Sequence, residues 1–325
     1  MQLTLEKIKE PVKAELKAFE PLFSEAMQSK VPFLKLITNY ILRRKGKQMR
    51  PMFVMLSAKM HQPIADSTFV MACLIELLHT ATLIHDDVVD ETYQRRGVFS
   101  LNALWKSKVS VLVGDFLLSK GLQLAVEKKE LGLLEIVSTS VQQMSEGELL
   151  QIQESKKLAI TEEIYFEVIR KKTASLIAAC TAGGAKSVGV SAEVIEKMRL
   201  FGEYAGMAFQ IKDDIFDYQK NKFTGKPSGN DIKEKKLTLP LIFVLKNISA
   251  SERKRIRGII AHHNQNPEKV NEVIDFVVKN KGLEYAEEKM MEFRDKANAI
   301  LDEFPKNDAR ESLKNLVDFS IKRIS

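Results

Sequence analysis

The sequence predicts an all-α fold made of one bundle of packed helices. Apolar residues recur at three- and four-residue spacing along almost the whole chain of 325 residues, which is the period of helices with a buried face. Alternating or β-branched runs bounded by turn residues, the pattern of strands, are scarce. No Gly-, Pro- or Ser-rich stretch is long enough for an interdomain linker. We therefore expect a single domain over residues 1–325.

Each expected helix is an apolar-periodic segment bounded by a glycine, a proline or a polar cluster. The segments are residues 3–19, 32–44, 51–59, 67–89, 101–126, 131–154, 162–182, 192–218, 237–246, 251–262, 267–280, 283–304 and 308–324. Two of them, around residues 72–84 and 175–182, are apolar on most faces, so we expect them at the centre of the bundle.

Composition excludes several classes of protein. The 50 basic and 43 acidic residues are mixed along the chain, which argues against a nucleic-acid-binding protein and fits small anionic substrates. The two cysteines, Cys73 and Cys180, lie apart in apolar stretches and suggest reduced core thiols. The apolar run from Phe69 to Ile84 is shorter than the ~20 residues of a membrane span. No signal peptide is indicated, so we expect a cytoplasmic protein with at most transient membrane contact.

The first candidate site is Asp86-Asp87-Val88-Val89-Asp90, at the end of a very apolar helix. Asp86 and Asp90 are four residues apart and share a helix face. Carboxylates are unfavourable at the negative end of a helix unless a cation compensates them. Hard carboxylate oxygens suit magnesium held jointly by protein and phosphate. A solvated acidic helix end is the competing interpretation.

A second cluster of the same form makes coincidence a poor explanation. Asp213-Asp214-Ile215-Phe216-Asp217 again ends an apolar helix. Basic residues occur where a diphosphate would need them, because arginine forks and lysine ammonium groups bind phosphate oxygens. These residues are Lys47, Arg50, Arg95, Arg96, Lys226 and Lys236.

From about Arg43 to Pro240 the sequence resembles the trans-polyprenyl diphosphate synthase family. The matching segments occur in family order: Gly46-Lys47-Gln48-Met49-Arg50-Pro51, His79 to His85, Asp86 to Asp90, Arg95-Arg96-Gly97, Gly114-Asp115, Lys172-Thr173, Gln210, Asp213 to Asp217, and Gly225-Lys226 through Asp231 to Lys236. The resemblance implies an isoprenoid synthase fold, with helices around a deep central cavity. It also implies a homodimer, and two aspartate (DDxxD) motifs that face each other.

The resemblance also assigns roles to individual residues. Asp86, Asp90 and Asp213 would bind magnesium, about three ions per active site, and Asp87, Asp214 and Asp217 would support these ligands. The allylic diphosphate would be held by Arg95, Lys172, Thr173, Gln210, Lys226 and Lys236. Isopentenyl diphosphate would be held by Lys47, Arg50, His79 and Arg96. Lys172 and Lys226 are counted with the magnesium ligands as catalytic, because cations stabilise a departing pyrophosphate.

Product length depends on the helix that precedes the first motif. Ala81 and Thr82 lie five and four residues before Asp86, where relatives with short products carry bulky aromatic residues. The pair is small here, so we expect an open tunnel. Burial of apolar surface at ~25 cal/mol per Å² favours a growing prenyl tail. We expect hexaprenyl to decaprenyl products, with octaprenyl diphosphate for quinone side chains as the central prediction, from a farnesyl or geranylgeranyl starter.

Other functions remain open. A geranylgeranyl diphosphate synthase would differ only in the depth of its cavity. A terpene cyclase would leave Lys47, Arg50, His79 and Arg96 unexplained, because it needs no second diphosphate site. A noncatalytic synthase subunit would be expected to have lost an aspartate motif, and a purely structural helical protein would leave both motifs to coincidence.

Overall fold

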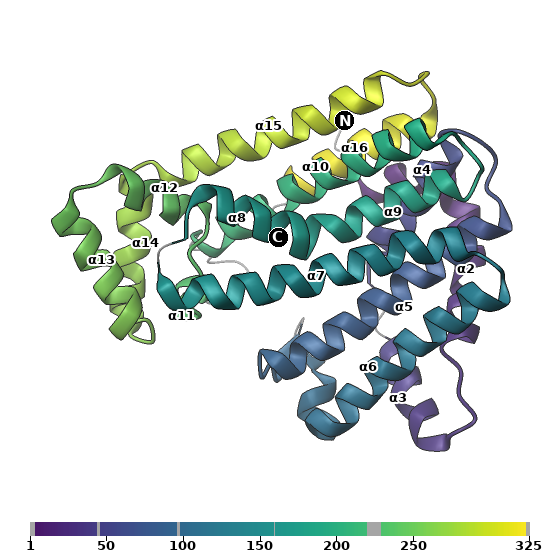
Figure 1. Ribbon diagram of the computed structural model, residues 1–325, viewed down its shortest axis with the longest axis horizontal. Helices are drawn as coiled ribbons and strands as arrows, with labels where there is room; N and C mark the ends of the chain where they lie inside the picture. Colours follow the sequence, from purple (N-terminus) through teal and green to yellow (C-terminus); the bar gives the residue numbers. More distant parts are fainter. Residues whose placement is uncertain (1–3, 44–45, 96–97, 159, 220–228, 323–325) are drawn as a thin grey trace. The chain divides into compact units, whose positions relative to one another are not determined.

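The computed structural model describes residues 4–43, 46–95, 98–158, 160–219 and 229–322, and most of these are helical (Figure 1). The α-helices are α1 (Leu5–Lys9), α2 (Lys13–Ala26), α3 (Pro32–Leu42), α4 (Met49–Lys59), α5 (Asp66–Val89), α6 (Leu101–Glu127), α7 (Leu131–Lys157), α8 (Glu162–Ile169), α9 (Ser175–Lys186), α10 (Ala192–Asp217), α11 (Asn230–Lys233), α12 (Leu239–Asn247), α13 (Ala250–His262), α14 (Pro267–Lys279), α15 (Gly282–Asp302) and α16 (Asp308–Lys322). The all-α prediction is confirmed.

Small departures from the predicted elements have local causes. The first predicted helix is interrupted by a 3₁₀ turn, η1 (Glu10–Val12), which contains Pro11, a residue that cannot donate a helical hydrogen bond. Two strands, β1 (Gln94–Arg95) and β2 (Val98–Phe99), pair as a short antiparallel hairpin after the first aspartate motif. The predicted helix over residues 162–182 contains a π-helical turn, η2 (Arg170–Ala174).

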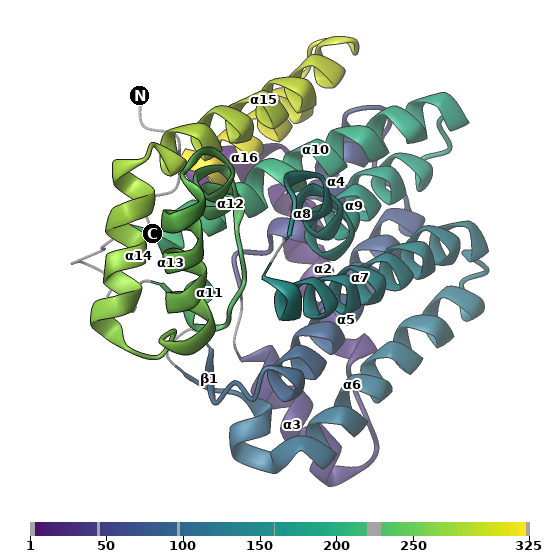
Figure 2. The same cartoon turned by 60° about the vertical axis from the view of Figure 1, so that its left-hand side comes forward.

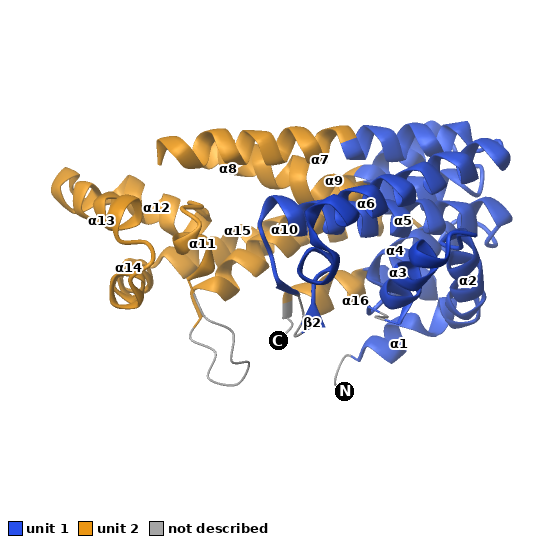
Figure 3. Cartoon of the chain, turned by 90° about the horizontal axis from the view of Figure 1, so that it is seen from below, with its two compact units in different colours: residues 1–141, 179–199, 306–313 blue, residues 142–178, 200–305, 314–325 orange. Residues whose placement is uncertain are grey.

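The chain divides into two compact units, which Figure 3 shows in different colours. Unit 1 consists of residues 1–141, 179–199 and 306–313, and unit 2 consists of residues 142–178, 200–305 and 314–325. Four of the five divisions fall within helices α7, α9, α10 and α16, and the fifth falls between α15 and α16. The expectation of one domain over the whole chain stays a prediction.

Helix α5 is the centre of unit 1. It runs beside α6, and it also contacts α4 and α2 (Figures 1 and 2). Glycines allow close approach here: a Cβ at Gly184 would lie 2.2 Å from the Val54 carbonyl oxygen, and one at Gly183 would lie 2.1 Å from Met71 Cε. The expectation that residues 72–84 are central is met within this unit, because most of their side chains are buried.

Unit 2 has its own apolar core. Helix α12 contacts α8, α14 and α15, while α14 also contacts α13 and α15. Buried aliphatic residues from these helices and from α10 fill the centre, among them Ile211, Ile215, Leu241 and Val273. Burial of this kind stabilises a fold by ~25 cal/mol per Å². The core holds α8 and the second half of α10 in place, and these two elements carry much of the site described below.

By length and composition alone, α5 and α6 are long and apolar enough to cross a membrane. For α5 the explanation is burial, because 61% of its most apolar stretch is covered within the protein. For α6 the covered share is 33%, so much of its apolar surface is exposed.

Candidate active site

The first aspartate motif lies at the C-terminal end of α5. The Asp87 side chain is buried, Asp86 is half-buried, and Asp90 caps the helix with an exposed side chain. Backbone hydrogen bonds fix this end: the Asp90 N–H donates to the Asp86 carbonyl (2.8 Å), and the Thr92 N–H donates to the Asp87 carbonyl (3.0 Å). Two carboxylates therefore remain at the surface of the helix end, where a cation would be favoured.

His85, next to the motif, has a packing role. Its ring lies against Gly114 of α6, where a Cβ would be only 2.1 Å from Nε2. The same nitrogen lies 3.2 Å from the Val111 carbonyl oxygen and 3.5 Å from a carboxylate oxygen of Asp115. His85 therefore joins α5 to α6.

The second aspartate motif lies at the C-terminal end of α10, and its three carboxylates differ in environment. Asp213 is exposed, whereas Asp214 is only 5% exposed. Asp217 accepts hydrogen bonds from the backbone N–H groups of Asn230 (3.0 Å) and Asp231 (2.9 Å). It thereby caps α11, since carboxylates are favourable at helix N-termini.

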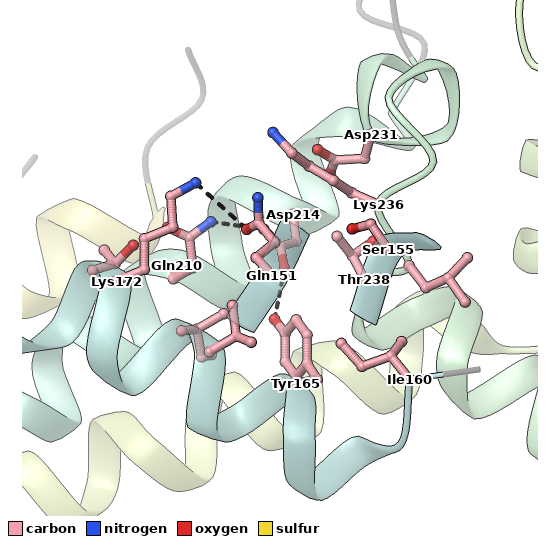
Figure 4. A pocket seen from close by; sticks show the side chains of 14 residues that line it. Gln151, Ser155, Ile160, Tyr165, Lys172, Gln210, Asp214, Asp231, Lys236 and Thr238 are labelled. Atoms are coloured by element: carbon pink, nitrogen blue, oxygen red, sulfur yellow. Dashed lines mark hydrogen bonds between the residues drawn. The ribbon is translucent and has the colours of Figure 1, made fainter. Parts of the chain in front are cut away.

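A pocket of about 120 Å³ in unit 2 brings together several of the predicted substrate-binding residues (Figure 4). Lys172 and Thr173 come from η2, Gln210 from α10, and Lys236 from the segment before α12. The wall is completed by Gln151, Ser155, Ile160, Tyr165, Val168, Ile169, Asp214, Asp231, Leu237 and Thr238. The pocket combines two ammonium groups with hydroxyl and amide groups, which is a set suited to a phosphate-bearing ligand.

Lys172 and Thr173 lie on the π-helical turn. The Ser175 N–H donates to the Arg170 carbonyl, five residues earlier, and such turns are frequent at functional sites. The Lys172 ammonium forms an ion pair with Glu148 of α7 and lies 3.5 Å from the Gln151 amide oxygen. Glu148 therefore holds this cation beside the pocket.

Burial changes the protonation of two carboxyl groups at the pocket. Burial, together with the nearby Asp213 and Asp217 carboxylates, raises the pKa of Asp214 to about 7, although the hydrogen bonds from Tyr165 and Gln210 act to lower it. Burial likewise raises the pKa of Asp231 to about 8, with contributions from Asp214 and Asp217. A nearby cation would favour the charged form of both groups and lower both pKa values.

The residues predicted to hold isopentenyl diphosphate belong to unit 1. Lys47 is exposed just before α4, Arg50 is half-buried in the first turn of α4, and His79 is half-buried on α5. Arg96 and Lys226 lie outside the described residues, and for Arg95 the structure describes only the backbone, in β1. The assigned roles of all these residues stay predictions.

Ala81 and Thr82 face different surroundings on α5. Ala81 is fully buried in a cluster with Leu77, Ile84 and Leu117, against which Phe23, Tyr40, Trp105 and Phe116 also pack. Thr82 is half-buried, and its hydroxyl donates to the His79 carbonyl (3.0 Å). Aromatic residues from outside α5 thus pack against the cluster that contains Ala81.

Among the described residues, no three His, Cys, Asp or Glu side chains converge as ligands of one metal ion. Each unit still presents hard oxygen donors: Asp86 and the cap residue Asp90 lie at the end of α5 in unit 1, and Asp213 is an exposed carboxylate of α10 in unit 2. Magnesium commonly takes only one or two protein carboxylates and completes its shell with water and substrate phosphates. Oxygen donors of this kind suit a divalent metal that is bound together with a diphosphate.

Sequence reasoning missed Tyr165 and Glu148. The Tyr165 hydroxyl donates to Asp214 Oδ2 at 2.6 Å (Figure 4), and Glu148 pairs with Lys172. Tyr165 precedes Lys172 by two helical turns. This spacing is the sequence signal that could have placed Tyr165 near Lys172. Neither residue belongs to an aspartate motif.

Two curated relatives align with nearly the whole chain. An all-trans-nonaprenyl-diphosphate synthase (geranyl-diphosphate specific) from Rhodobacter capsulatus is 36% identical over 97% of this chain and 96% of its own length. An octaprenyl diphosphate synthase from Escherichia coli (strain K12) is 34% identical over 99% of both.

Solved structures are similar over the same range. A polyprenyl synthase from Caulobacter crescentus, complexed with calcium and isoprenyl diphosphate, superposes with a TM-score of 0.92 at 32% identity, covering 100% of this chain and 99% of its own. A geranylgeranyl pyrophosphate synthase from Bacteroides thetaiotaomicron has a TM-score of 0.84 at 38% identity, covering 98% of each chain.

The family model for polyprenyl synthetase matches residues 31–277. This range includes both aspartate motifs and every residue that lines the pocket. The names of the relatives agree on prenyl diphosphate synthesis and differ in the length of the chain. The chain therefore belongs to the polyprenyl synthetase family and is a trans-prenyltransferase, a polyprenyl diphosphate synthase with the all-α isoprenoid synthase fold.

Proposed function

We propose that this synthase adds isopentenyl diphosphate to farnesyl or geranylgeranyl diphosphate and makes a long all-trans product, with octaprenyl diphosphate as the central prediction. One observation supports the placement of the allylic substrate: Lys172, Thr173, Gln210 and Lys236 line a single pocket. Cations fixed in such a pocket stabilise the charge that develops on a departing pyrophosphate.

Divalent metal dependence goes with the family and with the calcium-bound relative, and we propose magnesium as the metal. Asp86, Asp90 and Asp213 would hold it, because their oxygen donors suit a hard cation shared with phosphate. When bound, magnesium supplies charge stabilisation to the leaving group. The side chains of Lys172 and Lys236 would hold the diphosphate, and aliphatic side chains such as Ile169 would form part of the pocket wall.

The proposal of a long product rests on α5. Ala81 has a small side chain, and it belongs to a cluster of aliphatic residues against which aromatic residues pack. The aromatic rings of Phe23, Trp105 and Phe116 pack against this cluster, so they are candidates for the wall that ends growth. Octaprenyl and nonaprenyl synthases among the relatives support the same range of products.

The test is to incubate the purified protein with magnesium, farnesyl diphosphate and labelled isopentenyl diphosphate, and to size the products after the phosphates are removed. Hexaprenyl or longer products are expected. Thr82→Phe and Ala81→Phe should shorten them, because a ring at either position would obstruct the tail. A geranylgeranyl product from the unaltered protein would instead favour a shorter-chain synthase, which the Bacteroides relative represents.

A terpene cyclase and a noncatalytic subunit would give different results in the same assay. A cyclase would ionise the allylic substrate without incorporating isopentenyl diphosphate. A noncatalytic subunit would give no product alone. The whole-chain relatives are named as synthases, which favours the transferase.

We further propose that the protein is a homodimer. Support comes from apolar side chains that the chain leaves exposed on α6, namely Leu104, Val111, Leu112, Leu122 and Val126. Large exposed apolar patches are typical of protein interfaces. Light scattering of Leu122→Lys should show monomer, whereas Val278→Lys, an exposed apolar position on α14, should keep the mass of the unaltered protein.

We propose a cytoplasmic location and a role in quinone side-chain synthesis. The free, buried thiols of Cys73 and Cys180 are compatible with a reducing compartment. Cell fractionation tests the location. Mass spectrometry of quinones in cells that express the protein tests the role, and a tail length unchanged by expression would count against it.

A further inference from the structure

Four side chains that line the pocket form a continuous chain of hydrogen bonds, and Figure 4 labels three of them, Tyr165, Asp214 and Gln210. The Thr173 hydroxyl donates to Gln210 Oε1 (2.8 Å), and Gln210 Nε2 donates to Asp214 Oδ1 (2.8 Å). The Tyr165 hydroxyl donates to the other carboxylate oxygen, Asp214 Oδ2, at 2.6 Å. The chain links η2, α10 and α8.

The chemistry of these groups orients the Gln210 amide. Both Asp214 oxygens accept hydrogen bonds, one from the Tyr165 hydroxyl and one from the Gln210 amide nitrogen, so the nitrogen end of the Gln210 amide faces Asp214. The amide oxygen then faces Thr173, whose single proton is used in that bond. Gln210 keeps one N–H that can be donated to a ligand in the pocket, whereas Thr173 keeps only acceptor capacity.

Tyr165 holds Asp214 in the orientation that this arrangement needs. The two residues are 3% and 5% exposed, so water has little access to replace a lost donor. A buried acceptor that loses its partner carries a substantial penalty. Without the Tyr165 hydroxyl, one oxygen of the Asp214 carboxyl would lack its donor, and the carboxyl would gain by rotating toward another donor. That rotation would weaken its hold on Gln210.

We propose that Tyr165 is a positioning residue for the allylic diphosphate, acting through Asp214 to keep one amide N–H of Gln210 available to a phosphate oxygen. This inference rests on the proposed function, because it takes the pocket as the allylic diphosphate site. Tyr165 itself needs no contact with substrate.

The test compares Tyr165→Phe with a matched control. The control is Tyr285→Phe, which also removes a hydroxyl that donates to a carboxylate. The Tyr285 hydroxyl, on α15, donates to Glu162 at the start of α8 at 2.6 Å. Tyr285 does not line the pocket. Calorimetry would measure the binding of farnesyl thiodiphosphate, an unreactive analogue, with magnesium. We expect Tyr165→Phe to bind it on the order of tenfold more weakly, a typical cost for one hydrogen bond to a charged group. Tyr285→Phe should bind it as the unaltered protein does.

A double-mutant cycle tests whether the effect passes through Asp214. Tyr165→Phe should weaken binding much less in an Asp214→Asn background than in the unaltered protein, because coupled residues are not additive. The KM for isopentenyl diphosphate should stay unchanged in Tyr165→Phe, which a general loosening of the fold would not predict. If Tyr165→Phe fails to fold, Asp214→Asn, which keeps the size of the side chain, tests the same link by its effect on binding.

The outcomes separate the two hypotheses. Normal binding by Tyr165→Phe, or additive costs in the cycle, would overturn this inference and leave the proposed function standing. Failure of the unaltered protein to bind the analogue would overturn both.

Discussion

At the scale of single residues, the second aspartate motif shows how identical side chains take different roles. Asp213 is exposed, Asp214 is buried between Tyr165 and Gln210, and Asp217 caps α11. Asp214 accepts hydrogen bonds from two side chains, and Asp217 accepts them from two backbone N–H groups. Asp213 is the exposed member of this motif, and we propose it as the one that binds a metal shared with substrate.

This difference predicts opposite results for two substitutions. Asp213→Ala should lower turnover by orders of magnitude and leave the urea unfolding curve nearly unchanged, because an exposed carboxylate contributes little to stability. Asp217→Ala should lower the free energy of unfolding by about 1 kcal/mol or more, because it removes the cap of α11. Steady-state kinetics and urea unfolding of both variants check the prediction. Near-normal turnover of Asp213→Ala would contradict the metal assignment.

At the scale of elements, the π-helical turn η2 packs closely against two glycines, Gly147 and Gly206. A Cβ at Gly147 of α7 would lie 2.7 Å from the Lys172 backbone nitrogen, and one at Gly206 of α10 would lie 2.6 Å from Ala174 Cα. Both neighbours are backbone atoms, so they can yield only if a whole element moves. The two glycines therefore let α7 and α10 approach the turn that presents Lys172 and Thr173 to the pocket.

Gly147→Ala should force α7 and η2 apart. We expect a loss of about 1–3 kcal/mol in the free energy of unfolding, as for other overpacked sites, and a raised KM for the allylic substrate because Lys172 and Thr173 would move. Gly258→Ala on α13 is the control, since a Cβ there meets nothing within 4 Å and alanine favours a helix by up to about 1 kcal/mol. Equal effects of the two substitutions on KM would argue against this role of Gly147.

At the scale of the whole molecule, carboxyl groups with raised pKa values link stability to pH. Asp214 and Asp231 have pKa values of about 7 and about 8 in the folded protein, against an ordinary 3.8, chiefly because burial disfavours their charged forms. At pH values between the ordinary pKa of 3.8 and the raised pKa values, the folded state therefore binds more protons than the unfolded state. By linkage, the stability of the metal-free protein is greatest at low pH in this window and falls as pH rises.

We predict that urea unfolding of the metal-free protein will show this loss between pH 5 and pH 8. The slope should not exceed about 1.4 kcal/mol per pH unit for each group. Asp231→Asn should flatten the slope, because the amide does not ionise, and should matter least near pH 5, where Asp231 is already protonated in the folded state. A slope that is unchanged by this substitution would show that Asp231 is not one of the responsible groups.

Much of the architecture could be predicted from local pattern. The boundaries of α5, α10 and α14 follow the helical period to within a residue or two, and the aspartate motifs end α5 and α10 as expected. The short helix α11 and the turn η2 were missed. Each depends on a tertiary partner: Asp217 caps α11, and Gly147 and Gly206 enclose η2.

The sequence by itself determined the family, the all-α fold and the types of residue that carry the chemistry, because motif spacing and helical period are local properties that a single chain displays in order. Only the tertiary structure decided which of these residues meet. Tyr165 and Asp214 are 49 positions apart, and Lys172 and Glu148 are on different helices. Such contacts form when separate helices bury their apolar faces against one another, so the pairing depends on how the whole core packs.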